Sequence, residues 1–408
     1  MMKALHYYWI FALLLFCFAC QEDTDDTPSP STDGSSLLSL SADGSSDGAS
    51  SSGETSSGGN TGGVPSENPP PAAGQITAGE WSDLVNWDFW LGLGQNEDWK
   101  RSQDSWELFT KHRYQVQVQD RNGLPVVDAT ATLHDTQGAI LWQGHTDASG
   151  VAELWSIEPA ASAQVTYRGQ SAEVSKLVPF GQGVTTFSLP TVRSCPDQID
   201  VLFAVDATGS MGDELEYLKS ELSDVISRIE PTARVRLSTV FYRDQGDAYV
   251  TRSFRFTDNV SQMIENIRRQ SADGGGDYPE AVHSALGESI QKMNWSDQAT
   301  ARLLFLLLDA PPHENPEVKE QLQTLIPEAA QKGIRIIPIS ASGIDKPTEF
   351  LLRTMAILTQ GTYVFITDHS GIGNDHLEPT IGEYEVEMLN DLLVRLINEY
   401  GAKCGQQL

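Results

Sequence analysis

The chain has little positive charge, and this shortage narrows the partners that it can bind. Its 408 residues include 27 Lys and Arg against 56 Asp and Glu, a formal net charge of -29. No run of Lys or Arg is longer than a pair. Because phosphate backbones are bound by basic stripes, we do not expect nucleic acid as a partner. An acidic surface instead favours solubility and attracts divalent cations.

Two signatures of catalysis are also missing. The sequence contains no G-x-x-x-x-G-K-[ST] phosphate-binding loop. No Ser or Cys stands in a recognisable nucleophile elbow. These absences argue against phosphate binding by a P-loop and against a nucleophile of the hydrolase type.

Cysteine is scarce, and the four that are present fall into two pairs. Cys17 and Cys20 lie in or just after an N-terminal hydrophobic run, whereas Cys195 and Cys404 bracket the C-terminal half. If the first two are removed or modified, only the pairing of Cys195 with Cys404 is left. That arithmetic suggests an oxidising compartment and one structural disulfide, with two free thiols as the alternative.

Residues 1–20 have the proportions of a signal peptide. Lys3 precedes an apolar segment that is too short to span a bilayer comfortably. Ala19-Cys20 resembles a bacterial lipobox, which implies a lipid anchor on Cys20. Gln21-Glu22-Asp23 resembles the acidic tract that directs such lipoproteins to the bacterial outer membrane or cell surface. An ordinary cleaved signal peptide, giving a secreted or periplasmic protein, is the alternative.

The next two segments are a predicted flexible linker and a segment that is unusually rich in aromatic residues. Residues 21–75 are rich in Ser, Gly and Asp, which predicts a disordered linker with a span of roughly 40 Å. Residues 76–112 crowd five Trp residues into a short window. We expect these rings to dock on the following domain as core, and a carbohydrate-binding stripe is the alternative.

Residues 113–191 alternate with the period of β-strands. Tyr114, Val116 and Val118 stand on one face of such a strand, and turn signals such as Asn122-Gly123 separate the runs. The segment is predicted to be a small β-sandwich. It resembles carboxypeptidase-regulatory-like and bacterial Ig-like modules, which implies a spacer.

Residues 195–404 alternate apolar runs with amphipathic segments. This order predicts an α/β fold with a doubly wound parallel sheet and helices on both faces. Ligands of such sheets bind at the carboxyl ends of the strands, near a switch in strand order. Strands are predicted at 199–205, 234–241, 302–308, 334–339 and 362–366, and helices at 212–229, 258–270, 280–293, 316–331, 347–358 and 384–399.

Asp206 stands where the first predicted strand of this region ends, and Thr208 and Ser210 follow in a tight turn. A carboxylate and two hydroxyl groups at the carboxyl end of a central strand make an all-oxygen cradle. Such a cradle suits Mg²⁺ or Mn²⁺. Helix caps and turn formers are the alternative roles for these side chains.

The motif D-A-T-G-S at 206–210 resembles the D-x-[ST]-x-S signature of von Willebrand factor A domains. G-G-G-D-Y-P-E at 274–280 and L-L-L-D-A-P-P-H at 306–313 resemble the second and third metal loops of that family. The resemblance implies a metal-ion-dependent adhesion site with Mg²⁺ or Mn²⁺, or alternatively Ca²⁺. The implied ligands are Asp206, Thr208, Ser210, Asp277 and Asp309.

Asp277 stands at or near the position where adhesive members offer a threonine. An added carboxylate would neutralise more of the metal charge, so the metal would hold a carboxylate of a partner less strongly. The disulfide between Cys195 and Cys404 would close this domain, because the termini of such a fold lie near each other.

The resulting hypothesis is a metal-dependent binding protein of the cell surface rather than an enzyme. The metal would engage a protein or extracellular-matrix ligand through an acidic residue of that ligand. One alternative is a structural component of a surface complex, in which the metal only stabilises the loops. The other is a metal-dependent hydrolase, with His313 and Glu314 as candidate acid or base groups.

Overall fold

The computed structural model describes residues 71–229 and 234–402. Residues 1–20 with Cys17 and Cys20, most of the predicted linker, and Cys404 lie outside the described residues. Within the described ranges, no helix is both long and apolar enough to cross a membrane.

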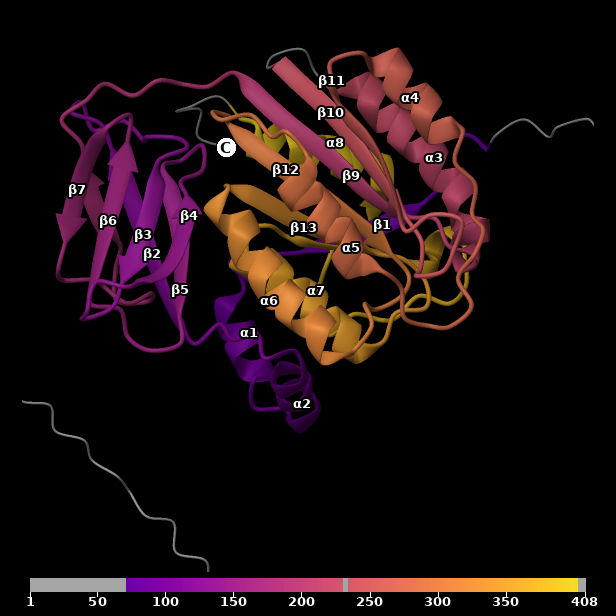
Figure 1. The fold of residues 1–408 in the computed structure, drawn as a ribbon, viewed down its shortest axis with the longest axis horizontal. Coiled ribbons are helices and arrows are strands. Elements are labelled where there is room, and N and C mark those ends of the chain that lie inside the picture. Colours follow the sequence, from indigo (N-terminus) through magenta and orange to yellow (C-terminus); the bar gives the residue numbers. More distant parts are fainter. Residues whose placement is uncertain (1–70, 230–233, 403–408) are drawn as a thin grey trace, which may run out of the picture. The chain divides into compact units, whose positions relative to one another are not determined.

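An eight-stranded, mostly parallel sheet forms the centre of the α/β domain (Figure 1). The parallel strands pair in the order β10-β9-β12-β13-β14. Every residue of β12 and β13 is buried, as expected for a covered parallel sheet. The predicted fold class is thus confirmed. The parallel strands are β9 (Gln198–Asp206), β10 (Arg234–Tyr242), β12 (Ala301–Leu308), β13 (Ile334–Ser340) and β14 (Tyr363–Ile366).

Helices cover both faces of this sheet (Figure 1). The chain passes from β9 to β10 on one side and later returns to β12 on the other. The carboxyl ends of β9 and β12 therefore flank the switch in strand order, where ligands bind in such sheets. One face is covered by α5 (Val282–Gly287), α6 (Pro316–Gln331) and α7 (Lys346–Leu358), the other by α3 (Gly212–Arg228), α4 (Val260–Arg268) and α8 (Leu389–Tyr400).

Three elements differ from the prediction. The strand β11 (Thr251–Thr257) adds an antiparallel edge beside β10, and its polar sequence gives little apolar signal. The predicted helix at 280–293 is divided into α5 and a π-helical turn, η2 (Glu288–Lys292). The helix predicted to begin at residue 384 begins at Leu389, because β15 (Glu387–Met388) pairs with the sheet just before it.

Residues before the β-sandwich also belong to the sheet, so the α/β domain extends beyond the predicted range 195–404. Strand β1 (Thr77–Trp81) lies antiparallel between β14 and β15. Just before it, the fully buried Glu221 of α3 accepts hydrogen bonds from three successive backbone N–H groups. The donors are Gly74 N and Gln75 N at 2.9 Å and Ile76 N at 3.2 Å.

The Trp-rich segment forms α1 (Trp87–Leu93) and α2 (Glu97–Trp106) and packs as core. The rings of Trp90 and Trp99 lie 5.8 and 5.4 Å from the ring of Phe350 on α7. Beneath them the buried Arg353 donates to Asp83 Oδ1 (2.6 Å) and Oδ2 (2.9 Å). Five Trp side chains of this segment are less than a tenth exposed: Trp81, Trp87, Trp90, Trp99 and Trp106.

The β-sandwich is inserted between β1 and β9. Its two sheets have the strand orders β5-β2-β8 and β4-β3-β6-β7, and the alternating residues Tyr114, Val116 and Val118 lie in its core. The strands are β2 (His112–Gln119), β3 (Thr130–His134), β4 (Ile140–His145), β5 (Val151–Ser156), β6 (Ser162–Tyr167), β7 (Gln170–Val174) and β8 (Thr185–Ser188).

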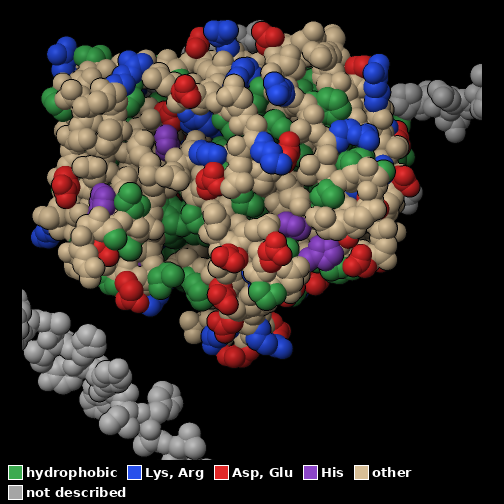
Figure 2. Space-filling view, in the orientation of Figure 1, with side chains coloured by type: hydrophobic (Ala, Val, Ile, Leu, Met, Phe, Trp, Pro, Cys, Tyr) green, Lys and Arg blue, Asp and Glu red, His purple; other side chains and the backbone are tan. Residues whose placement is uncertain are grey.

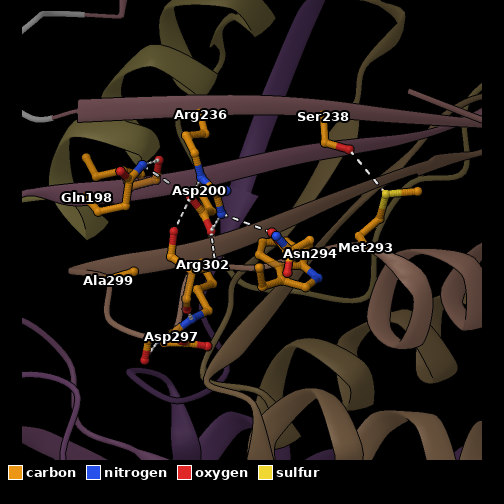
Figure 3. A network of polar contacts seen from close by, with 12 residues as sticks. Gln198, Asp200, Arg236, Ser238, Met293, Asn294, Asp297, Ala299 and Arg302 are labelled. Carbon is orange, nitrogen blue, oxygen red and sulfur yellow. Dashed lines mark hydrogen bonds and ion pairs between the residues drawn. The ribbon is translucent and has the colours of Figure 1, made fainter. Parts of the chain in front are cut away.

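A buried polar network lies near the amino ends of β9, β10 and β12 (Figure 3). The fully buried Asp200 accepts hydrogen bonds from Arg236 Nε (2.9 Å) and Nη2 (2.6 Å), and from Ser296 N (2.6 Å). The carbonyl of Ser296 in turn accepts from Arg302 Nε at 2.8 Å. The network therefore links three neighbouring strands through the loop that precedes β12.

Arg302 also joins the β-sandwich to the sheet. Its Nη1 and Nη2 atoms each lie 2.9 Å from one carboxylate oxygen of Asp128, and both side chains are less than a tenth exposed. Asp128 also accepts from Ala299 N (3.1 Å) and contacts His145 Nδ1 (2.7 Å). We call the Asp128–Arg302 pair the latch. Loss of either partner would leave a buried charge unpaired, which is strongly destabilising.

Candidate metal centre

Asp206 is the last residue of β9 and is fully buried. Its Oδ1 atom accepts hydrogen bonds from Thr208 N (2.9 Å) and Thr208 Oγ1 (2.7 Å), and Ser210 Oγ lies 3.1 Å from that hydroxyl. The Oδ2 atom has no hydrogen-bond partner among the described residues. Thr208 is buried whereas Ser210 is exposed, so the turn opens to solvent on the Ser210 side.

Asp309 follows β12 and brings a second carboxylate to the same edge of the sheet. It is 5% exposed, and its Oδ1 atom also has no partner among the described side chains and backbone. Burial and the nearby Asp309 hold the pKa of Asp206 well above its ordinary value. The pKa of Asp309 is likewise raised by burial and by Glu214, against a hydrogen bond from Ser210.

The second loop presents Glu280 rather than Asp277 to these carboxylates. Asp277 is exposed. Glu280 is 2% exposed, and its backbone N–H donates to the carbonyl of Pro311 (2.8 Å) in the loop after β12. Burial and the charges of Asp206 and other carboxylates raise the pKa of Glu280 to about 9. Its Oε2 atom also has no hydrogen-bond partner among the described residues.

Glycine residues let the first and second loops approach each other. Gly209 N donates to the carbonyl of Gly274 at 3.1 Å. Gly275 has a φ of +72°, and a Cβ there would lie 3.1 Å from Glu280 Oε1 and 3.4 Å from Thr208 Cβ. A side chain at this position would both strain the backbone and crowd the two loops.

Tyr242 and Arg243, at the end of β10, support the first two loops from behind. Arg243 is buried and donates to the carbonyls of Ala207 (3.1 Å) and Ser271 (2.8 Å). The fully buried Tyr242 lies beside Asp206, and burial followed by that carboxylate raises its pKa. Arg243 therefore holds the backbone of the two loops, and the ring of Tyr242 packs beside the carboxylate of Asp206.

A second polar group borders the centre. His313 Nε2 lies 2.7 Å from Asp244 Oδ1, and burial followed by the charge of His313 lowers the pKa of His283. Histidine side chains also gather beside acidic ones on the face seen in Figure 2. Glu314 points elsewhere, since its Oε2 accepts from Ser105 of α2 (3.2 Å). The structure therefore pairs His313 with a carboxylate and separates it from Glu314.

The oxygen set fits a hard divalent cation. Asp206, Thr208, Ser210 and Asp309 offer two carboxylates and two hydroxyls, the donors that Mg²⁺ and Mn²⁺ prefer. The described residues contain no group of three or more His, Cys, Asp or Glu side chains arranged around a common metal position. A cradle of two carboxylates and two hydroxyls does not require such a group. The unpartnered Asp206 Oδ2 and Asp309 Oδ1 are the atoms that a cation would satisfy.

Of the remaining predicted site residues, Cys195 belongs to the described part of the chain, whereas Cys20 lies outside it. Cys195 is exposed, and Cys404 lies outside the described residues. The backbone of Gly401 lies against the side chain of Ile199 at the start of β9, so the two ends of this part of the chain are close together. The disulfide and the lipidation of Cys20 remain predictions.

The motif alone did not identify Glu280 as the buried carboxylate. Asp277 and Glu280 stand in one short motif, and both residue types can bind a cation. The deciding contact is a β-bridge between Glu280 and Pro312, two residues that are distant in sequence. Glu214, which acts on Asp309 through its charge, follows the first motif in α3 and carries no signature of its own.

Comparisons with known proteins match the part of the chain that holds this centre. Residues 200–374 match the family model of the von Willebrand factor type A domain. A putative ariadne-like RING finger protein of Acanthamoeba polyphaga mimivirus is 30% identical over 133 residues, which are 31% of this chain and 13% of that protein. The alpha-protein kinase vwkA of Dictyostelium discoideum is 29% identical over 132 residues, 31% of this chain and 20% of the kinase.

The chain thus spans a fifth or less of the length of these relatives. The structure of a conserved hypothetical protein, BatB from Bacteroides thetaiotaomicron, aligns with a TM-score of 0.35 and 14% identity. That alignment covers 50% of this chain and 98% of BatB. Domains of the matched family generally mediate protein–protein interactions, often with a bound metal. The chain contains a von Willebrand factor type A domain, matched over residues 200–374.

Proposed function

We propose that this protein binds a protein or matrix ligand through a Mg²⁺ or Mn²⁺ ion held by Asp206, Thr208, Ser210 and Asp309. The observation that carries the proposal is the pair of buried carboxylate oxygens, Asp206 Oδ2 and Asp309 Oδ1, that lack partners among the described residues. A buried anionic oxygen without a partner is costly, and a cation would offset that cost.

Some residues of the centre supply negative charge for the metal, and others hold those residues in position. Asp206 and Asp309 supply the negative charge, and Thr208 holds Asp206 through two hydrogen bonds. Ser210 stands at the exposed side, where a ligand can approach. A bound divalent ion would supply the attraction for a carboxylate of the partner.

Asp277 does not add its charge to the buried carboxylates of the centre. It is exposed, whereas Asp206 and Asp309 are buried. Each additional carboxylate beside a metal neutralises more of the metal charge, so the exposed position of Asp277 favours an electrophilic ion, which is the property that adhesion to an acidic ligand requires.

We also propose that the protein is held at the bacterial cell surface or outer membrane by a lipid on Cys20, and the alternative is a secreted or periplasmic protein. The support is the Ala19-Cys20 motif and the linker that follows it. Metabolic labelling with a fatty acid tests this anchor. Label that is retained in Cys20→Ala would contradict lipidation at this residue.

The central experiment measures binding of Mg²⁺ and Mn²⁺ by calorimetry. Asp206→Asn and Asp309→Asn should each weaken Mn²⁺ binding by more than roughly 100-fold, since even second-sphere changes cost 10–100-fold. Asp277→Asn is the matched control, an exposed carboxylate of the same loops, and should bind within a few-fold of the parent. Equal loss in all three variants would assign Asp277 to the centre. An unchanged affinity in Asp206→Asn would overturn the proposal.

Capture of partner proteins distinguishes metal-dependent binding from a purely structural role and from catalysis. Surface proteins retained by the mature chain should be lost with EDTA and with Asp206→Asn. Capture that survives both treatments would favour a structural role, in which the metal only stabilises the loops. Hydrolysis of ester substrates that is lost in Asp309→Asn would instead favour an enzyme, with His313 as the nearby candidate acid or base.

A further inference from the structure

Glu214 contacts two loops at the edge of the metal centre. It lies in the first turn of α3 and is 2% exposed. Its Oε1 atom accepts a hydrogen bond from Ser342 N (3.2 Å) in the loop after β13. Its Oε2 atom has no partner among the described residues. Burial is the main cause of the raised pKa of Asp309, and the charge of Glu214 raises it further. Glu214 therefore acts electrostatically on the metal centre.

His376 lies between Glu214 and Asp368, in the loop that follows β14. Its side chain is 3% exposed. Nδ1 lies 2.7 Å from Asp368 Oδ1, and the backbone N–H of His376 donates to the same oxygen at 3.0 Å. Nε2 lies 3.2 Å from Glu214 Oε1, an ion-pair distance without the alignment of a hydrogen bond. The second contact therefore depends mainly on charge.

Gly373 brings the loop close enough for these contacts. Its φ is +84°, and a Cβ at this position would overlap the carboxylate of Glu214. Only glycine meets both conditions, since other residues avoid this backbone region and need room for a side chain. The loop from residue 367 to residue 377 is thus shaped to lie against α3.

We propose that Glu214, His376 and Asp368 form a clasp that closes the loop 367–377 over the first turn of α3 when His376 is protonated. The clasp holds one side of the rim around the metal centre. Deprotonation weakens it and frees the loop. The partner-binding surface next to the centre therefore has a closed form at lower pH and an open form at higher pH.

The charge requirement follows from the donors of imidazole. A neutral ring carries one N–H, which serves the contact of Nδ1 with Asp368, so Nε2 would turn a lone pair toward Glu214, whereas imidazolium carries a positive charge between the two carboxylates. The charged groups that act on His376 are Glu214 from α3 and Asp368 from η3 (Asp368–Ser370). His369, Glu378 and Tyr384 line the adjoining cavity of about 230 Å³.

These surroundings set the direction of the pH dependence. Burial lowers the pKa of His376, but Glu214 and Asp368 outweigh burial and raise it above the ordinary value of 6.5. The clasp is therefore fully present below 6.5 and is lost as the pH rises through the raised pKa. Asp368 shows the reciprocal effect, since hydrogen bonds from His376 lower its pKa.

The first test measures the pKa of His376 by exchange of its ring C2 hydrogen, followed by mass spectrometry of the full chain in EDTA. EDTA keeps the outcome independent of metal binding, so failure of the clasp and failure of the metal proposal are distinguishable. We expect a pKa above 6.5 that falls in Glu214→Gln and in Asp368→Asn. Asp368 is the exposed end of the clasp, with a side chain 63% exposed, so its substitution should not prevent folding.

The second test follows amide exchange of residues 367–377 at pH 6, corrected for intrinsic rates. His376→Gln should exchange roughly tenfold faster than the parent, the factor expected for one charge-assisted contact. His369→Gln, an exposed histidine of the same loop, is the control and should match the parent. A pKa of His376 that stays the same in both carboxylate variants, or equal loop exchange in His376→Gln and the parent, would overturn the clasp.

Discussion

The latch between Asp128 and Arg302 predicts a stability difference that depends on charge. Burial alone would raise the pKa of Asp128, but hydrogen bonds from His145 and Arg302 lower it from 3.8 to about 2. At about 1.36 kcal/mol for each pKa unit, the contacts of the Asp128 carboxylate with His145 and Arg302 add roughly 2 kcal/mol of stability at pH 7. A lowered pKa gives stability that is present above the unfolded pKa and is lost as the pH falls. Roughly half of this contribution should remain at pH 3.

The perturbation is Asp128→Asn, which keeps the shape of the side chain and tolerates the positive φ of 57° at this position. It leaves the buried Arg302 without a counter-charge, so we expect a loss of about 3 kcal/mol at pH 7. Urea unfolding, followed by Trp fluorescence at pH 7 and pH 3, measures the difference between variant and parent. Glu173→Gln, an exposed acid of the same β-sandwich, is the control.

Two results would refute this reasoning. A difference of equal size at pH 3 and pH 7 would show that shape, rather than charge, explains the loss. A difference below about 0.5 kcal/mol at pH 7, the range of an ordinary surface substitution, would show that the buried pair does not contribute.

Three further predictions concern the α/β domain. Mn²⁺ affinity measured by calorimetry should fall as the pH falls, because the raised pKa of Asp206 makes protons compete with the cation. Gly361→Ala should lower the unfolding midpoint in urea by crowding a backbone carbonyl of β13, whereas Gly92→Ala, which meets nothing within 4 Å, should not. Asp83→Asn should cost about 3–5 kcal/mol in the same assay, since it leaves Arg353 buried without one of its two carboxylate partners.

The parallel strands were predictable because each is a buried apolar run with its own local pattern. Strand β1 was not, since T-A-G-E-W is short and its partners β14 and β15 lie near the other end of the chain. The same limit applies to the candidate site. Asp206 and Asp309 end apolar strands and could be placed from sequence, whereas the burial of Glu280 depends on a bridge to Pro312. Contacts between distant loops, such as Glu214 with His376, leave no periodic signal.

The entry of the chain into the sheet has a mechanical consequence. Ala78 of β1 pairs with Ile366 of β14, so β1 begins at the edge of the sheet where the parallel strands end. A pull on the chain upstream of Gly74 would load the backbone contacts of Glu221 first, then peel β1 from its two neighbours, beginning at Thr77. A ligand held at Asp206 would pull on the same edge. Force between a ligand at the proposed metal centre and the proposed lipid anchor would therefore cross the α/β domain and leave the inserted β-sandwich unloaded.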